Sequence, residues 1–202
     1  MSVGEPLLAA QQLSLVRGER ELFSGLTVDV APGELWQIVG ANGSGKTSLL
    51  RILAGLSRYG FEGAVTRACI PLYLGHDSAV KGLLTPRENL RWHVSGEGDY
   101  SASQIEAALS AVGLYGYEDL PSHTLSAGQH RRVNLARLHL SSSPLWLLDE
   151  PFTAIDKSGV SALERLMEQH VARGGAVVLT SHQALAVACP VRELALTAGI
   201  AQ

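Results

Sequence analysis

Eight consecutive residues constrain the fold of this chain more than any other part of its sequence. Residues 40–47 read Gly-Ala-Asn-Gly-Ser-Gly-Lys-Thr, a complete match to the pattern G-x-x-x-x-G-K-[ST]. Apolar Leu35, Ile38 and Val39 precede this loop and predict a strand, whereas residues 48–50, Ser-Leu-Leu, continue as a helix. A strand, a glycine-rich loop and a helix in this order predict an α/β fold with a parallel sheet.

The residue types in the loop suit the binding of a nucleotide. Its glycines let successive backbone N–H groups turn toward phosphates, its lysine supplies a positive charge, and its threonine offers a hydroxyl to Mg²⁺. A glycine-rich turn that binds nothing is the alternative, which the strand before it and the helix after it disfavour. The predicted nucleotide-binding residues are Gly40, Ala41, Asn42, Gly43, Ser44, Gly45, Lys46 and Thr47, of which Thr47 is also a predicted Mg²⁺ ligand.

Length and composition narrow the classes of protein that need to be considered. A chain of 202 residues suits one domain, with room for a small lobe. A formal net charge of −3 provides no broad basic field, so a nucleic-acid partner is not expected. Cys69 and Cys189 lack metal-ligand spacing. No apolar run approaches the roughly twenty residues that span a bilayer, so any membrane-crossing segments would belong to other chains.

The pattern of apolar residues predicts two kinds of structure along the chain. Residues 7–16 and 21–30 predict a small antiparallel β-layer before the loop, and strand–helix alternation resumes at residue 144. Between them lies a helical lobe, expected over about residues 77–142 of a single domain. Thr85 with Glu88 and Ser103 with Glu106 are the predicted capping boxes of its first two helices.

A second group of residues suits phosphoryl transfer. Residues 144–151 form a short apolar strand that ends in Asp149 and Glu150, as expected of a Walker B strand. Asp149 would hold Mg²⁺, and Glu150 would orient or deprotonate the attacking water. Two solvated acids at a strand end are the alternative, but the complete phosphate loop upstream favours the catalytic interpretation.

A third motif lies between these two groups in the sequence. Residues 125–129, Leu-Ser-Ala-Gly-Gln, begin a predicted helix in which Ser126 is the cap. In this order the motifs resemble those of the ATP-binding cassette (ABC) family, whose Leu-Ser-Gly-Gly-Gln signature stands between the phosphate loop and Walker B. The resemblance implies the ABC type of P-loop fold and ATP as the nucleotide. It also implies that Ser126, Gly128 and Gln129 face the ATP of a second copy in a head-to-tail homodimer.

Four further residues are assigned through this resemblance. Asp156, after Walker B, resembles the D-loop aspartate at the dimer interface, and His182 resembles the switch histidine that hydrogen-bonds the γ-phosphate. His76 stands where the family has a glutamine, which puts its Mg²⁺ role in doubt because an imidazole cannot both donate and accept from adjacent atoms. Arg17 replaces the aromatic residue that stacks on adenine; stacking of its guanidinium and a solvated loop arginine are both open.

Several details are similar to one branch of that family, the haem exporter ATP-binding subunits of cytochrome c maturation. They are the short chain, Glu88-Asn89-Leu90 after His76, Arg131-Arg132-Val133 after the signature, and the run of residues 148–156. This resemblance implies integral membrane subunits as partners, a peripheral position on the cytoplasmic face of the bacterial inner membrane, and docking near residues 73–90. A soluble ABC ATPase of a cofactor-assembly scaffold, or the ATPase of another small transporter, remains the alternative.

Haem itself is not expected to bind this chain directly. Its histidines form no axial-ligand motif such as C-x-x-C-H. They are His76, His93, His123, His130, His139, His170 and His182.

Overall fold

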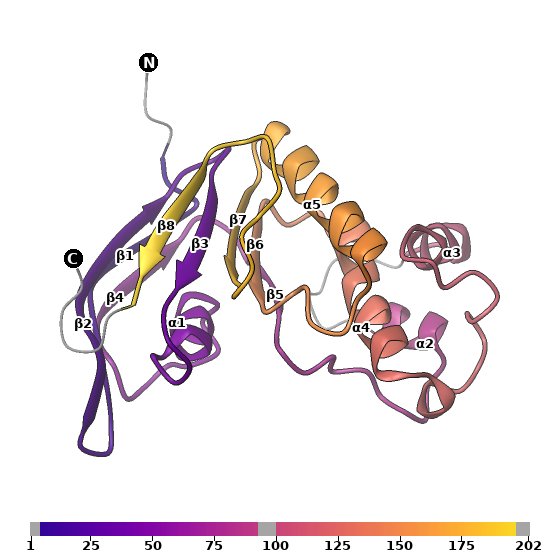
Figure 1. Cartoon of the computed structure of the whole chain (residues 1–202), viewed down its shortest axis with the longest axis horizontal. Helices are drawn as coiled ribbons and strands as arrows, with labels where there is room; N and C mark the ends of the chain where they lie inside the picture. Colours follow the sequence, from indigo (N-terminus) through magenta and orange to yellow (C-terminus); the bar gives the residue numbers. More distant parts are fainter. Residues whose placement is uncertain (1–4, 93–99, 197–202) are drawn as a thin grey trace. The chain divides into compact units, whose positions relative to one another are not determined.

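The computed structural model describes residues 5–92 and 100–196. They form two compact units (Figure 1). The core unit takes its residues from Met1–Tyr73, Ser143–Pro151 and Leu163–Gln202, and the helical unit from Leu74–Ser142 and Phe152–Ala162. Compared with the lobe expected over about residues 77–142, the helical unit begins three residues earlier and takes in a second segment after Pro151.

The elements follow in the order β1 (Leu8–Arg17), β2 (Arg20–Val30), β3 (Leu35–Val39), α1 (Lys46–Leu53), β4 (Glu62–Arg67), β5 (Leu72–Leu74), α2 (Pro86–Arg91), α3 (Ala102–Ala111), η1 (Ser122–Thr124), α4 (Ala127–Ala136), η2 (Arg137–His139), β6 (Leu145–Asp149), α5 (Lys157–Ala172), β7 (Ala176–Thr180) and β8 (Val191–Ala195). None of the helices among the described residues combines the length and apolar character that crossing a membrane requires.

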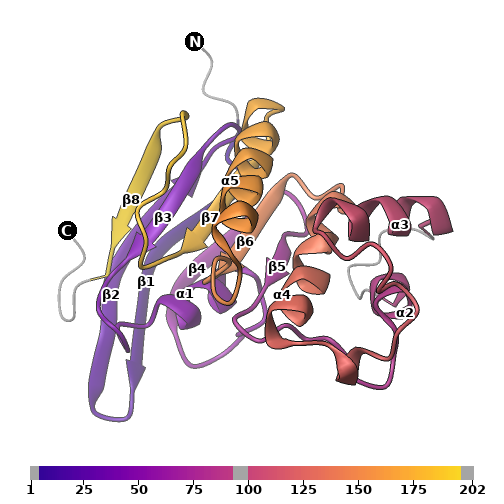
Figure 2. The same ribbon diagram turned by 45° about the vertical axis from the view of Figure 1, so that its right-hand side comes forward.

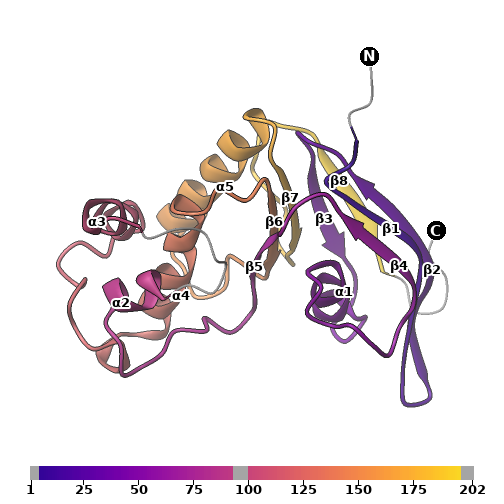
Figure 3. The ribbon, with the colours of Figure 1, turned by 180° about the vertical axis from the view of Figure 1, so that it is seen from behind.

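An antiparallel sheet in the order β2-β1-β4 forms one layer of the core unit (Figure 3). Strands β1 and β2 pair as a hairpin, with Leu8 opposite Val30 and Arg17 opposite Arg20. The turn contains Gly18 at φ 62°, a left-handed conformation that glycine adopts at little cost. The predicted antiparallel layer is confirmed, and β4 adds a third strand that pairs with β1.

A second sheet, in the order β5-β6-β7-β3-β8, carries the parallel strands. Strand β7 pairs in parallel with both β6 and β3, and β3 pairs in parallel with β8. Every residue of β6 and β7 is buried, as expected of central strands in a parallel sheet. Because β3, β6 and β7 run in one direction, the residues after their carboxyl ends meet at one edge of the sheet.

The two sheets and α1 share one hydrophobic core. Phe23 of β2, Leu49 and Leu53 of α1, Leu147 of β6 and Val178 of β7 are all buried within it. Helix α1 contributes because its apolar residues recur at helical spacing and therefore lie on one face. The phosphate loop, between β3 and α1, is consequently held at both ends by buried elements.

Helices α2, α3 and α4 pack together in the helical unit around buried Leu90, Ile105 and Val133 (Figure 2). The predicted capping box of Thr85 and Glu88 is confirmed at α2. The Ser126 cap is confirmed at α4, where Gln129 donates and accepts the reciprocal hydrogen bonds.

The predicted box of Ser103 and Glu106 is wrong. Helix α3 begins earlier, because Ser101 accepts from the Gln104 N–H while the Gln104 side chain accepts from the Ser101 N–H. Ser103 lies inside the helix, and its hydroxyl contacts that of Ser101. Two overlapping S-x-x-[EQ] patterns compete here, and the earlier one satisfies the free N–H groups of the helix start.

Asn89 of α2 fixes the loop that precedes this helix. Its side-chain nitrogen, on a residue only 4% exposed, shares its two N–H groups among the carbonyls of Lys81, Leu84 and Thr85 and the hydroxyl of Ser122, all within hydrogen-bond distance. Its side-chain oxygen accepts from the Lys81 N–H at 2.8 Å. One buried side chain therefore ties the whole Lys81–Thr85 turn to the helical unit.

We expect Asn89→Ala to lower the free energy of unfolding by about 1–3 kcal/mol, because the Lys81 N–H loses its acceptor and the buried Ser122 hydroxyl loses a donor. Urea denaturation followed by circular dichroism would measure the loss. Ser110→Ala, on the exposed side of α3, is the control and should stay within about 0.5 kcal/mol of the parent. Equal stability of the two variants would contradict the role given to Asn89.

Candidate functional site

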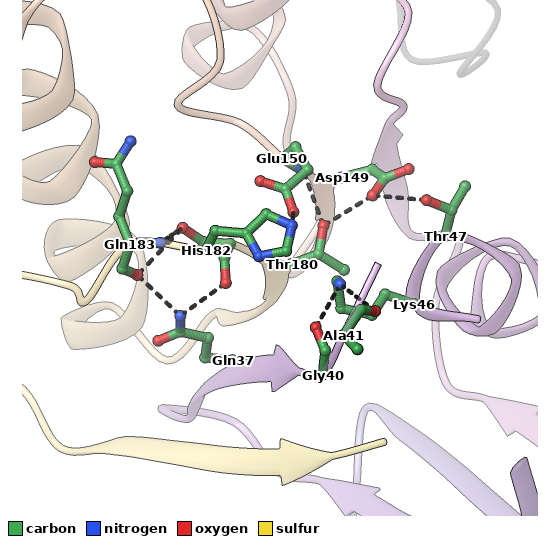
Figure 4. Close-up of polar contacts among 11 residues, drawn as sticks. Gln37, Gly40, Ala41, Lys46, Thr47, Asp149, Glu150, Thr180, His182 and Gln183 are labelled. Carbon is green, nitrogen blue, oxygen red and sulfur yellow. Dashed lines mark hydrogen bonds and ion pairs between the residues drawn. The ribbon is translucent and has the colours of Figure 1, made fainter. Parts of the chain in front are cut away.

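The phosphate loop passes between β3 and α1 in the core unit. Gly40 must be glycine, because a Cβ there would lie 2.7 Å from the carbonyl oxygen of Leu196. Gly45 precedes α1 with φ 100°, a conformation that L side chains rarely adopt. Lys46 is 8% exposed, and its ammonium donates to the carbonyls of Gly40 at 2.8 Å and Ala41 at 3.1 Å (Figure 4).

The residues of the loop fit a phosphate chain. Lys46 carries a positive charge that its two carbonyl partners do not neutralise. Ser44 is 3% exposed, and its hydroxyl has no hydrogen-bond partner among the described residues. Buried polar groups are rarely left unsatisfied, so a phosphate oxygen would complete this hydroxyl. The loop lies at the amino end of α1, where the helix dipole also favours an anion.

A chain of hydrogen bonds links α1 to the ends of β6 and β7 (Figure 4). The hydroxyls of Thr47 and Thr180 donate to the same Asp149 oxygen, at 3.2 and 2.8 Å, and the Glu150 N–H donates to the Thr180 hydroxyl at 2.8 Å. Asp149 is 1% exposed. The parallel register explains these contacts, because Asp149 and Thr180 are neighbours across β6 and β7.

The donor set of this chain fits Mg²⁺. A threonine hydroxyl and a carboxylate are the hard oxygen ligands that Mg²⁺ prefers, and Mg²⁺ commonly takes only one or two carboxylates together with waters and phosphates. The described part of the chain contains no cluster of three or more His, Cys, Asp or Glu residues that could hold an ion alone. Thr47 and Asp149 therefore suit an ion that is bound together with a nucleotide.

Glu150 and His182 face each other at the same edge of the sheet. His182 Nε2 lies 3.5 Å from Glu150 Oε1, with the two side chains 56% and 22% exposed. Glu150 has a left-handed backbone at φ 48°, which is unusual outside glycine and stores strain of the kind found at functional sites. A partly buried carboxylate beside an imidazole can orient a water molecule and exchange a proton with it.

The structure brings together one part of the predicted site. The loop of residues 40–47, Asp149, Glu150 and His182 all belong to the core unit. The other predicted residues divide between the two units. Arg17 belongs to the core unit, at the exposed end of β1, whereas His76, Ser126, Gly128, Gln129 and Asp156 belong to the helical unit.

Within the helical unit, the start of α4 contacts the segment after Pro151. A Cβ at Gly128 would lie 2.8 Å from the carbonyl oxygen of Ala154, which explains why a glycine is needed there. Arg132 of α4 forms a 2.6 Å ion pair with Asp156, at the start of α5. The hydroxyl of Ser158 donates to Asp156 and is the main cause that holds the pKa of this carboxyl below its ordinary value.

The side chain of His76 is exposed. Its main chain is hydrogen-bonded by Arg131 of α4, the helix that begins in the signature motif. The Arg131 guanidinium donates to the carbonyls of Gly75 at 2.8 Å and His76 at 3.3 Å.

In the core unit, Arg20 reaches the phosphate loop, because its Nη1 lies 3.9 Å from the position that a Cβ would have at Gly43. Sequence reasoning considered Arg17 as the arginine near the nucleotide and did not consider Arg20.

Two residues of the site were missed by sequence reasoning, Gln37 and Thr180. Both are buried, at 6% and 0% exposure; Gln37 lies within the otherwise apolar strand β3, and Thr180 is the last residue of the otherwise apolar strand β7. Gln37 donates to the main chain on both sides of His182, and Thr180 joins Asp149 to Glu150. A polar residue inside a buried strand was the available signal, because such a group costs free energy unless it is hydrogen-bonded.

We expect Thr180→Val, which keeps the shape of the side chain, to lower the maximal rate of ATP hydrolysis by about tenfold. The Asp149 carboxylate loses one donor and the Glu150 N–H loses its acceptor, so both acids are less well positioned. Steady-state ATPase assays would measure the change. Thr66→Val on exposed β4 is the matched control, and equal rates in the two variants would contradict the assignment.

Comparisons with known proteins identify what this chain is similar to. A family model described as "ABC transporter" matches residues 23–153. The cytochrome c biogenesis ATP-binding export protein CcmA of Yersinia pestis is 52% identical, with 94% of this chain and 93% of the relative covered. The protein of the same name from Hahella chejuensis is 48% identical, with 96% and 97% covered.

Two solved structures have the same fold. The first is a dimeric post-hydrolysis state of the ATP-binding cassette MJ0796 bound to ADP and Pi. It has a TM-score of 0.84 and 21% identity, with 96% of each chain covered. The second, an ATP binding subunit of an ABC transporter, has a TM-score of 0.83 and 24% identity, with 96% of this chain and 88% of the other covered.

Proposed function

We propose that this chain, which belongs to the ABC transporter family and, within it, to the cytochrome c biogenesis ATP-binding export proteins, hydrolyses ATP to drive haem export for c-type cytochrome biogenesis. One observation carries the catalytic part: a phosphate loop, a Thr47–Asp149 pair and a Glu150–His182 pair stand at one edge of a single parallel sheet. Together they provide phosphate binding, a metal ligand set and a base for water.

The residues have separate roles in the proposed hydrolysis of ATP. The loop and Lys46 bind the phosphates, and Thr47 with Asp149 would hold Mg²⁺, which neutralises charge on the β- and γ-phosphates when bound. Glu150 orients the attacking water and accepts its proton. His182, whose Nε2 lies 3.5 Å from Glu150 Oε1, would hydrogen-bond the γ-phosphate. The strained backbone of Glu150 is consistent with a carboxylate held in place for this purpose.

We further propose that two copies form a head-to-tail dimer with two identical ATP sites. Ser126, Gly128 and Gln129 at the amino end of α4 would face the γ-phosphate of the other copy, where the helix dipole favours negative charge. Asp156 would lie at the same interface. The fold neighbour bound to ADP and Pi is dimeric, which supports the proposal of a dimer.

The remaining assignments follow from the family. We propose that the whole chain, residues 1–202, acts as one nucleotide-binding domain in which His76 contributes to catalysis and Arg17 binds the nucleotide through its adenine. Its membrane partners would be integral transporter subunits that dock near residues 73–90, with the chain on the cytoplasmic face of the bacterial inner membrane. This chain itself would not ligate haem. Of the histidines considered above, His93 lies outside the described residues.

A deletion strain tests the proposed export function. Loss of c-type cytochromes with haem synthesis intact, restored by the parent gene but not by the Glu150→Gln gene, is the expected result. Normal c-type cytochromes in the deletion strain would contradict it. Co-purification separates the alternatives, because membrane subunits would support transport, whereas a soluble complex would support an assembly scaffold.

A further inference from the structure

Gln37 places a polar side chain inside the parallel sheet, where its neighbours on β3 are mainly apolar. The residue is 6% exposed, and its side-chain amide donates to the carbonyl oxygens of Ser181 at 3.3 Å and Gln183 at 3.0 Å (Figure 4). All three residues belong to the core unit. A buried amide costs free energy unless its hydrogen bonds are made, so this contact is specific.

The two carbonyls that Gln37 binds stand on either side of His182. The same short segment is closed by Ser181, whose hydroxyl accepts from the Gln183 N–H at 2.9 Å and donates to the Gln183 carbonyl at 3.2 Å. The main chain of residues 181–183 is therefore held both by its own turn and by β3. The His182 side chain is 56% exposed, so the main chain is the principal constraint on where its imidazole lies.

Strand register explains how Gln37 reaches this segment. On β7, Gln37 is the partner of Leu179, two residues before Ser181. Its long side chain extends beyond the last paired residues, whereas a shorter side chain at this position would end inside the sheet. Strand β3 also leads directly into the phosphate loop, so a single strand carries that loop and fixes the segment that bears His182.

We propose that Gln37 is a positioning residue for ATP hydrolysis, which holds the main chain on both sides of His182 and so fixes its imidazole against Glu150 and the γ-phosphate. This inference rests on the proposed ATPase function. The proposed role differs from a purely structural one, because Gln37 would affect turnover only through the position of His182. Loss of the amide should lower the maximal rate much more than it weakens ATP binding.

Gln37→Met tests the inference, because methionine has a similar length and no hydrogen-bond donor. In the full chain, purified with the membrane subunits that accompany it, we expect kcat to fall about five- to tenfold while KM for ATP changes less than about twofold. Gln37→Asn, which keeps the amide but is one methylene shorter, should also lower kcat and serves if the methionine variant does not fold. Trp36→Phe is the control. Trp36 lies on the same strand as Gln37, and the substitution removes its hydrogen bond to Glu34 without removing any hydrogen bond to residues 181–183.

A double-mutant cycle with His182→Ala separates positioning from stability. In the His182→Ala background, Gln37→Met should change kcat by less than about twofold, because the residue it positions is already absent. Equal fold-losses in the two backgrounds, or an unchanged kcat in the parent background, would overturn the inference. A parent complex that hydrolyses no ATP would instead contradict the proposed function itself, so the two failures are distinguishable.

Discussion

Replacing Glu150 by glutamine is expected to lower the rate of ATP hydrolysis by about 100-fold or more, while ATP still binds. Removing a general base typically costs a factor of this size, and an amide has the shape of the carboxylate without its ability to take a proton. The hydrogen bond from Glu150 to Thr180 uses the main-chain N–H and therefore survives the substitution. Steady-state hydrolysis and equilibrium binding of ATP would measure the two effects separately.

The same substitution should also stabilise the proposed ATP-bound dimer, because hydrolysis, which would allow the dimer to reopen, becomes slow. Size-exclusion chromatography or light scattering in the presence of Mg²⁺ and ATP should detect a dimer for Glu150→Gln. Glu193→Gln, on the exposed side of β8, makes the same change in charge and should behave as the parent. Normal turnover in the Glu150 variant would remove this residue from the role of base.

The sequence was most informative where structure is determined locally. The strand, loop and helix around residues 40–47 were predicted because glycines and apolar periodicity each act within a few residues. Ser126 was predicted as a cap for the same reason, since its hydroxyl accepts from the Gln129 N–H only three residues further on. The run of apolar residues before Asp149 predicted β6, which is buried along its whole length.

Contacts between distant segments were not accessible in this way. Strand β8 was not predicted, because apolar and polar residues alternate only weakly over Val191–Ala195. The strand is defined instead by its pairing with β3. The roles of Gln37 and Thr180 depend on parallel register, which joins residues more than 30 positions apart in the case of Thr180 and Asp149. The segment after Pro151 joined the helical unit through Arg132 and Gly128, again a tertiary effect.

Lys46→Ala is expected to weaken ATP binding by about 10- to 100-fold. A hydrogen bond to a charged group contributes about 1.5–3 kcal/mol, and about 1.4 kcal/mol corresponds to a tenfold change in affinity. Lys46 is nearly buried and already bonded to the carbonyls of Gly40 and Ala41, so its charge is held in place before the nucleotide arrives. Truncation removes the charge and the donor to the Gly40 carbonyl, whereas the Ala41 carbonyl still accepts from the Ser44 N–H.

Equilibrium titration with ATP in the presence of Mg²⁺ would measure the affinity of Lys46→Ala, and circular dichroism would show whether the variant is folded. Lys157→Ala, at the exposed start of α5, removes the same charge and should bind ATP as the parent does. Lys46→Arg retains the charge, yet its planar and bulkier guanidinium cannot replace a compact ammonium bound to the two carbonyls, so weaker binding is expected there too. A folded Lys46→Ala variant with the affinity of the parent would show that this loop does not bind the phosphates.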